Sequence, residues 1–190
     1  MMLGMVDDAA ARDVDDLIAM LESSHAWDDL EGLSILDHGL QTAAILRTER
    51  PDDVEIQIAG LVHDLGWMHR DSLGKWRPVP DAAHDRDGAA RLRPLLGDRI
   101  ADLVEGHVAA KRYLVATDAG YRATLSPRSL ETLAFQGETM DAVDAAEFER
   151  RPNADDLVAL RRADDQAKVI GLEVPGLDAW RDAIENIVSE

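Results

Sequence analysis

Apolar residues recur at helical spacing along most of the chain, which predicts an all-α fold. The pattern is clearest over residues 14–21, 36–44, 58–65, 86–96, 98–115 and 177–188. No stretch of similar length alternates between apolar and polar residues, as a half-buried strand would. Residues 67–81 contain two prolines and one glycine, and this segment is predicted to form a loop.

Polar residues, prolines and glycines indicate where several of these helices begin and end. Asp52 followed by Glu55 has the pattern of a capping box, and Ser126 followed by Pro127 has the pattern of a helix start. Asn153 is expected to precede a late helix over 155–168. Gly66 and Gly137 are expected to stop helices. No repeat or linker divides the chain, so we expect residues 1–190 to form a single domain.

The composition narrows the classes of partner. Of the 190 residues, 46% are hydrophobic and 31% are charged, which suits one domain with a core large enough to enclose a site. Lys and Arg total 20 against 38 Asp and Glu, and this net charge of -18 argues against a nucleic-acid partner, because phosphate backbones are bound by cations. No segment approaches the ~18 apolar residues of a membrane span, and the first residues lack the pattern of a secretion signal. We therefore expect a cytoplasmic protein with no membrane partner.

The histidines are the first candidates for chemistry. The chain has no cysteine, so a metal would be held by histidine and carboxylate, a ligand set that suits iron or manganese. Of the six histidines, two are expected to be more exposed, His25 and His69, whereas four lie in or next to predicted helices: His38, His63, His84 and His107. One such histidine is usually a hydrogen-bonded core residue, but four of them favour a metal site. Asp64, directly after His63, could place a bridging carboxylate between two ions.

The string LVHDLG at 61–66 resembles the His-Asp dyad of the HD-domain superfamily, and the further ligands expected of such a domain are present before and after it in the expected order along the chain. This resemblance implies that the first iron is held by His38, His63, Asp64 and Asp164. It implies that the second iron is held by Asp64, His84 and His107. Asp165 is an equally available acid by composition, and only the resemblance favours Asp164.

Two longer strings are more specific than the dyad. EGHVAAKRYLV at 105–115 and LSPRSLETLAFQGETMD at 125–141 resemble the 2-amino-1-hydroxyethylphosphonate dioxygenases, which are mixed-valent diiron HD oxygenases. The resemblance extends from about residue 28 to 175 and includes DHGLQTA at 37–43 and AHDRDGAARL at 83–92. It implies a compact helical HD-domain bundle enclosing a dinuclear site, with an Fe(II)/Fe(III) pair and O2 as co-substrate. The implied reaction cleaves a carbon–phosphorus bond to give phosphate and a carboxylate.

The same resemblance assigns phosphonate binding to four residues: Lys111, Ser129, Thr132 and Arg161. Their spacing agrees with a shared cavity. Lys111 follows His107 by one helical turn, and Ser129 and Thr132 are also about one turn apart. Without the resemblance, Lys111 would be interpreted as a solvated lysine and the two hydroxyls as ordinary helix-start and surface residues.

Departures from the family pattern bear on the substrate's amine. Trp67 stands where the family has a histidine near the phosphonate, and Asp28 stands where it has a tyrosine that guards the second iron, whereas Glu31 retains the acid associated with the amine. Asp28 could be a replacement guarding ligand or part of an anionic pocket. A quaternary ammonium has no N–H group, so carboxylate charge and aromatic faces such as Trp27 and Trp67 would hold it. We therefore expect (R)-1-hydroxy-2-(trimethylammonio)ethylphosphonate, oxidised to glycine betaine and phosphate, rather than the primary-amine compound that would give glycine.

Three other functions are compatible with an HD domain. An HD phosphohydrolase would use Mn(II), Mg(II) or iron to activate water. A non-enzymatic ligand-binding module is disfavoured because no metal ligand is missing, and a diiron oxygenase acting on a polyol is disfavoured by the set of residues expected to bind an anion. For the phosphonate reaction we expect a small-molecule substrate supplied by an upstream phosphonate hydroxylase.

Overall fold

The computed structural model describes residues 10–28, 31–78 and 83–189. In these ranges the chain forms eight α-helices, two short 3-10 helices and two short strands. The helices are α1 (Val14–Ser24), α2 (Ile35–Glu49), α3 (Val54–Val62), α4 (His84–Thr117), α5 (Pro127–Phe135), α6 (Ala142–Glu149), α7 (Ala154–Gln166) and α8 (Asp178–Ser189), with 3-10 helices η1 (Leu65–Trp67) and η2 (Tyr121–Thr124). The all-α expectation is confirmed.

Two of the expected helix boundaries have different outcomes. At α5 the prediction is confirmed, because the Ser126 hydroxyl accepts a hydrogen bond from the Ser129 amide and a proline occupies the first turn. At α3 the capping box is wrong. The N-cap is Asp53, one residue later than expected, and its carboxylate accepts from the Ile56 amide. Glu55 instead pairs with Arg99 of α4 at 2.7 Å, so its carboxylate is used between helices.

The predicted loop over 67–81 is wrong in part. Strands β1 (Met68–Arg70) and β2 (Trp76–Pro78) pair as a small antiparallel hairpin. The Asp71 carboxylate shapes the turn by accepting hydrogen bonds from the Leu73 and Lys75 amides. Strands of three residues are too short for an alternating pattern to appear in the sequence.

Helix α4 consists of two helical halves joined by a kink. Gly97 has a φ of 83° and a ψ of 174° inside it, a conformation that favours glycine. The kink falls between the two helices expected over 86–96 and 98–115, so this prediction is confirmed. Because of the kink, the two halves of α4 can each present a histidine to the same interior.

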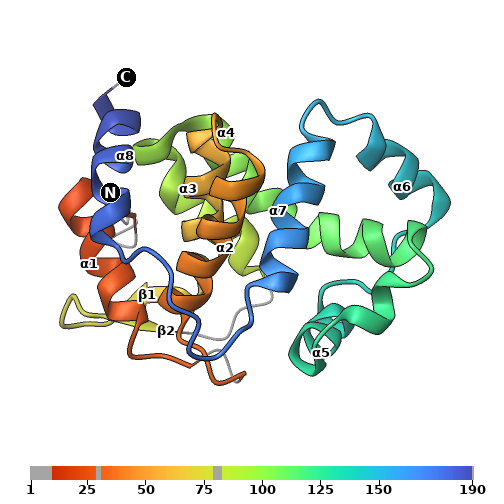
Figure 1. Ribbon diagram of the computed structural model, residues 1–190, viewed down its shortest axis with the longest axis horizontal. Coiled ribbons are helices and arrows are strands. Elements are labelled where there is room, and N and C mark those ends of the chain that lie inside the picture. Colours follow the sequence, from red (N-terminus) through yellow and green to blue (C-terminus); the bar gives the residue numbers. More distant parts are fainter. Residues whose placement is uncertain (1–9, 29–30, 79–82, 190) are drawn as a thin grey trace, which may run out of the picture.

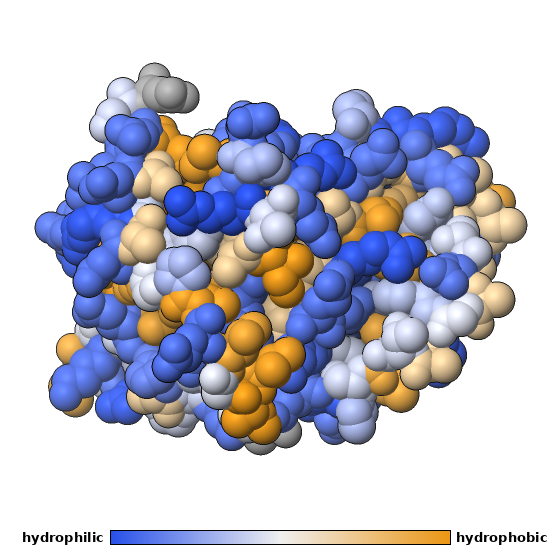
Figure 2. All heavy atoms as spheres, viewed as in Figure 1, coloured by the Kyte–Doolittle hydropathy of each residue, from blue (hydrophilic) through white to orange (hydrophobic). Residues whose placement is uncertain are grey.

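The elements lie side by side, with α1 and α8 at one end and α5 and α6 at the other (Figure 1). Between them α2 packs most extensively on α3, and α7 packs on both α2 and α4. Leucine, isoleucine and alanine side chains from α1 to α4, α7 and α8 form the main core, and a smaller cluster lies beneath η2 and α5: Leu114, Tyr121, Leu125 and Leu133. The visible surface is mostly hydrophilic (Figure 2), and in the described ranges no helix has the length and apolar character needed to cross a membrane.

Candidate active site

The six expected metal ligands converge where α2, α3, α4 and α7 meet. His38 lies on α2, His63 caps the end of α3 and Asp64 follows it, whereas α7 carries Asp164. His84 and His107 come from the two halves of α4. All four histidines and Asp164 are buried. Polar side chains buried together in a helical core require partners, which is a first indication of a bound group.

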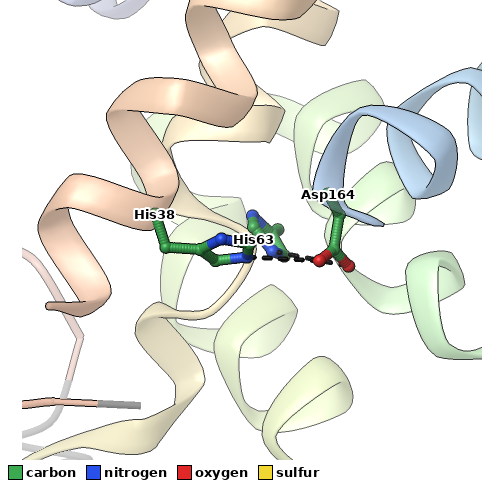
Figure 3. Close-up of side chains that lie close together, drawn as sticks. All are labelled: His38, His63 and Asp164. Atoms are coloured by element: carbon green, nitrogen blue, oxygen red, sulfur yellow. Dashed lines mark ion pairs between the residues drawn. The ribbon is translucent and has the colours of Figure 1, made fainter. Parts of the chain in front are cut away.

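The ligand atoms form two clusters. His38, His63 and Asp164 offer one set of atoms within 4.8 Å of one another, and Asp64, His84 and His107 offer a second. In the first cluster the Asp164 carboxylate reaches toward both imidazoles (Figure 3), with Oδ1 3.2 Å from His38 Nε2 and Oδ2 3.8 Å from His63 Nε2.

Asp64 lies between the two clusters and directs one carboxylate oxygen to each. Its Oδ2 is 3.7 Å from His38 Nε2 and 3.5 Å from His63 Nε2. Its Oδ1 is 3.5 Å from His84 Nε2 and 3.8 Å from His107 Nε2. This is the arrangement of a carboxylate that bridges two ions.

Backbone carbonyls orient three of the four imidazoles. The Nδ1 atoms of His38, His63 and His107 lie 2.8, 2.8 and 2.6 Å from the carbonyl oxygens of Ala167, Gly60 and Val104. A carbonyl can only accept, so each Nδ1 carries a proton, and Nε2 is the ring nitrogen that faces the site and could bind a metal ion. The fourth ring, His84, stacks on Trp67 with centroids 4.5 Å apart.

The donor set fits a pair of metal ions. His63 Nε2 is buried and has no hydrogen-bond partner among the described residues. A buried polar atom without a partner destabilises a protein by about 1–3 kcal/mol, and coordination of a cation would remove this penalty. Four imidazoles and two carboxylates are the ligand types of non-haem iron and of similar ions.

The ionisation states agree with cation binding. Burial alone would raise the pKa of both aspartates, but the charge of Arg161 on Asp164 and of His63 on Asp64 holds each pKa well below its usual range. Burial, reinforced by His84, lowers the pKa of His107 to about 3, so this ring is neutral. For His38 burial is outweighed by Asp164, which raises the pKa to about 9, so a proton leaves this ring when a cation binds.

A cavity of about 340 Å³ opens onto the two clusters. Its wall contains, besides metal-ligand candidates, all seven residues expected to contact substrate: Asp28, Glu31, Trp67, Lys111, Ser129, Thr132 and Arg161. Trp27, which was expected to offer an aromatic face, instead packs against the hydrophobic core, where its ring is partly buried. Of the two remaining histidines, His25 is exposed and His69 is half-buried beside Arg91.

Lys111 provides a buried cation in this wall. It is 3% exposed, and its Nζ donates a hydrogen bond to Thr132 Oγ1 at 3.0 Å. Burial, together with the charge of Arg161, lowers the pKa of Lys111 to about 7. An anion bound in the cavity would therefore meet a cation that is poorly neutralised by the protein itself.

Arg161 is more constrained than Lys111. Its Nη1 lies 2.6 Å from Oδ2 of Asp164, and its remaining nitrogens bond to Asp165 and to the Tyr121 hydroxyl at 3.0 Å. Asp165 thus neutralises Arg161 and lies outside both clusters, whereas Asp164 points into one of them. The guanidinium holds the Asp164 carboxylate in position and also borders the cavity.

Sequence reasoning missed four residues of the wall: Ile35, Arg128, Gln136 and Lys168. Lys168 is the most informative of them, because its ammonium lies 2.8 Å from Oε2 of Glu31. On the helix expected over 155–168, its spacing of four residues from Asp164 would place it one turn farther on the same face, and this signal could have identified it, although α7 ends at Gln166.

Comparison with known proteins agrees with this geometry. No protein-family model matches the chain. It is 35% identical over 158 residues to hydroxymethylphosphonate dioxygenase of Gimesia maris, across 82% of this chain and 78% of the relative. It is 36% identical over 151 residues to the glycine-betaine-forming 1-hydroxy-2-(trimethylamino)ethyl phosphonate dioxygenase of Leisingera caerulea, across 79% of this chain and 76% of the relative. The chain therefore belongs to the hydroxyphosphonate dioxygenase family and is an oxidoreductase.

Proposed function

We propose that this protein uses O2 to cleave the carbon–phosphorus bond of a small 1-hydroxyphosphonate. The observation that carries the proposal is the Asp64 carboxylate, which offers one oxygen to each cluster at the floor of a cavity lined by Lys111. The two named relatives both act on hydroxylated phosphonates, which supports the same substrate class here.

The six ligands would hold two iron ions, each within one cluster, with Asp64 shared. An Fe(II)/Fe(III) pair would supply a Lewis acid for the substrate and electrons for O2. The overall reaction balances with one O2 per substrate, since the hydroxylated carbon becomes a carboxylate and the phosphorus leaves as phosphate. No organic cofactor is needed.

The protein's own side chains would bind and orient the anion. Lys111 brings positive charge to the wall, and Ser129 and Thr132 bring hydroxyl groups from α5. Arg161 borders the same wall, where its guanidinium is paired with two aspartates and offers N–H groups rather than a net charge. Charged hydrogen bonds to a phosphonate are stronger than neutral ones, and burial strengthens them further. Holding the phosphonate at this wall would present the C1 hydroxyl to the clusters in a single orientation.

For the substituent on C1 we propose a trimethylammoniomethyl group, so that (R)-1-hydroxy-2-(trimethylammonio)ethylphosphonate would give glycine betaine. Trp67 supports this assignment because it lines the same cavity as Asp28 and Glu31, so an aromatic side chain and two carboxylates are available to a quaternary ammonium. The substrate already bears a hydroxyl group, so a phosphonate hydroxylase would supply it.

Hydroxymethylphosphonate is a second candidate, favoured by one observation. Glu31, the acid expected near the amine, is paired with Lys168. A substrate without a cation would leave this ion pair intact.

The test is O2-dependent phosphate release by protein purified with iron under anaerobic conditions. We expect about two irons per chain, phosphate release only after O2 is admitted, and an EPR signal from a coupled Fe(II)/Fe(III) pair after partial oxidation. Asp64→Ala should lose both irons, whereas His107→Ala should mainly empty the second cluster. Phosphate release without O2 would instead identify a phosphohydrolase, and an Asp64→Ala protein with both irons would contradict the bridging role.

A further inference from the structure

The ion pair between Lys168 and Glu31 lies in the cavity wall, but binding of a phosphonate does not explain it. Lys168 follows the end of α7, and Glu31 precedes α2. Their charged atoms are 2.8 Å apart, and the side chains are only 18% and 14% exposed. Pairs that are this protected from solvent interact more strongly than pairs on the open surface.

The Lys168 ammonium has three acceptors in the protein. Besides Glu31, it donates to Ser129 Oγ at 3.0 Å and to Ser126 Oγ at 3.3 Å. An ammonium has three N–H donors, so these three acceptors match its full capacity.

The backbone on both sides of Lys168 is fixed as well. The carbonyl of Ala167 accepts from His38, and the Val169 amide and carbonyl both bond to the Gln41 side chain. Lys168 is thus held in one position by the contacts of its ammonium and by the backbone hydrogen bonds of its two neighbours. It is an ordered part of the cavity wall.

This pairing changes what Glu31 can do. Burial alone would raise the pKa of Glu31, but the hydrogen bonds from Lys168 and Ser126 and the charge of Lys168 together lower it, so the carboxylate is ionised and already has a cation next to it. A substrate with an ammonium group at this carboxylate would have to share it with Lys168 or displace it. Two cations close together in a partly buried site repel each other.

We propose that Lys168 is a specificity-determining residue that disfavours phosphonates with a cationic substituent on C1 relative to those with none. The proposal rests on the proposed phosphonate reaction and deepens it: the enzyme accepts the trimethylammonium substrate, but with a lower kcat/KM relative to hydroxymethylphosphonate than it would have without the Lys168 charge. The discrimination between cationic and uncharged substituents would come from Lys168, which neutralises Glu31, and not from the groups that bind the phosphonate.

The test compares kcat/KM for the trimethylammonium substrate with kcat/KM for hydroxymethylphosphonate in the iron-loaded enzyme. Lys168→Met removes the charge but keeps the length of the side chain, which leaves Glu31 without its cation. We expect the ratio of the two constants to rise by about tenfold or more, which corresponds to ~1.4 kcal/mol. Lys168→Arg keeps the charge and should leave the ratio near that of the wild type. Both substrates see the same folded fraction, so the ratio is insensitive to a loss of stability.

Glu31→Gln provides a second variant in case Lys168→Met does not fold. It leaves Lys168 as a cation without its carboxylate, so the ratio should fall, opposite to the effect of Lys168→Met. An unchanged or lower ratio in Lys168→Met, or a higher ratio in Glu31→Gln, would overturn the proposal.

A binding measurement separates this proposal from the proposed function. Calorimetric titration of the anaerobic iron-loaded protein with methylphosphonate and with 2-(trimethylammonio)ethylphosphonate requires no turnover, because neither compound carries the C1 hydroxyl. Lys168→Met should again favour the cationic compound by about tenfold. If the wild type turns over neither hydroxylated substrate but the binding ratio shifts, the reaction is wrong and the role of Lys168 stands. If turnover occurs and neither ratio shifts, the role of Lys168 is wrong.

Discussion

At the scale of single residues, Lys111 is the clearest case of a side chain whose chemistry depends on its surroundings. Replacing it with alanine should raise KM by about tenfold or more, because a charged hydrogen bond in a buried site contributes ~1.5–3 kcal/mol. Iron content should stay at about two per chain, since Lys111 is not among the cluster ligands. Steady-state kinetics with metal analysis on the same preparation checks both points, and unchanged kinetics would remove Lys111 from the substrate site.

The pH dependence of Lys111 gives a second expectation for the same residue. Burial and Arg161 lower the pKa of Lys111 to about 7, so in the free enzyme the ammonium loses its proton as the pH rises through that value. The charged form binds the anion, so kcat/KM should fall by up to tenfold per pH unit above the pKa. A bound phosphonate dianion favours the charged lysine, and kcat should therefore decline only at higher pH. Lys111→Arg should remove the alkaline decline in kcat/KM, because arginine does not titrate in this range.

Residue identity alone left two neighbouring acids equivalent. Asp164 and Asp165 are adjacent in the sequence, yet Asp164 faces the histidines and Asp165 binds Arg161 and Tyr121. Neighbouring positions on a helix point about 100° apart, so one of the two must face away from the clusters. The packing of α7 against α2 and α4 selects Asp164.

At the scale of elements, the close approach of η1 to α4 brings Asp64 and His84 together. A Cβ on Gly66 would lie 1.7 Å from the carbonyl oxygen of His84, so only glycine allows this contact. Gly66→Ala should push η1 away from α4 and lower Tm by roughly 2–12 °C, since overpacking destabilises by ~1–3 kcal/mol. The second cluster should bind iron more weakly because one of its histidines moves relative to Asp64.

A matched glycine provides the control for this change. Among the described residues, no atom beyond the two chain neighbours lies within 4 Å of a Cβ placed on Gly176, so Gly176→Ala should leave Tm and iron content unchanged. Thermal denaturation and metal analysis of the two variants decide the point. A Gly66→Ala protein with wild-type stability and two irons would show that the contact is not needed to position His84.

The length of each element explains which ones the sequence predicted well and which it predicted poorly. The long helices have repeated apolar faces, and each was expected close to where it lies. The hairpin of β1 and β2 was missed, because its six strand residues are too few for a periodic pattern and its order depends on contacts with other elements. One of these is the contact of Arg70 with Asp16 of α1. Within the hairpin, the Arg70 guanidinium also lies over the Trp76 ring at 4.3 Å.

At the scale of the whole molecule, the candidate ligands come from four helical segments that would be tied together by bound ions. Removing iron with a chelator should lower Tm by roughly 5–10 °C, because a ligand present at a hundred times its Kd stabilises the fold by ~2.7 kcal/mol. Re-addition of Fe(II) should restore Tm. The Asp64→Ala protein should show almost no response to the chelator, which separates loss of iron from a general effect of the reagent. An identical Tm with and without iron in the wild type would contradict a structural contribution of the ions.

The sequence by itself determined the helical fold, because the spacing of apolar residues along a helix is a local property that a single chain displays. It also determined which residue types could serve as ligands, since the lack of cysteine left histidine and carboxylate. Its motifs carried the resemblance to the family to which the chain belongs.

Only the tertiary structure decided how these groups face one another. The two oxygens of Asp64 point to different clusters, Arg161 is paired with two carboxylates, and Lys168 neutralises Glu31 from a distant part of the chain. These relations depend on how α2, α4, α5 and α7 pack. A side chain's charge, partner and direction are set by neighbours that are remote in sequence, and local patterns along the chain do not encode them.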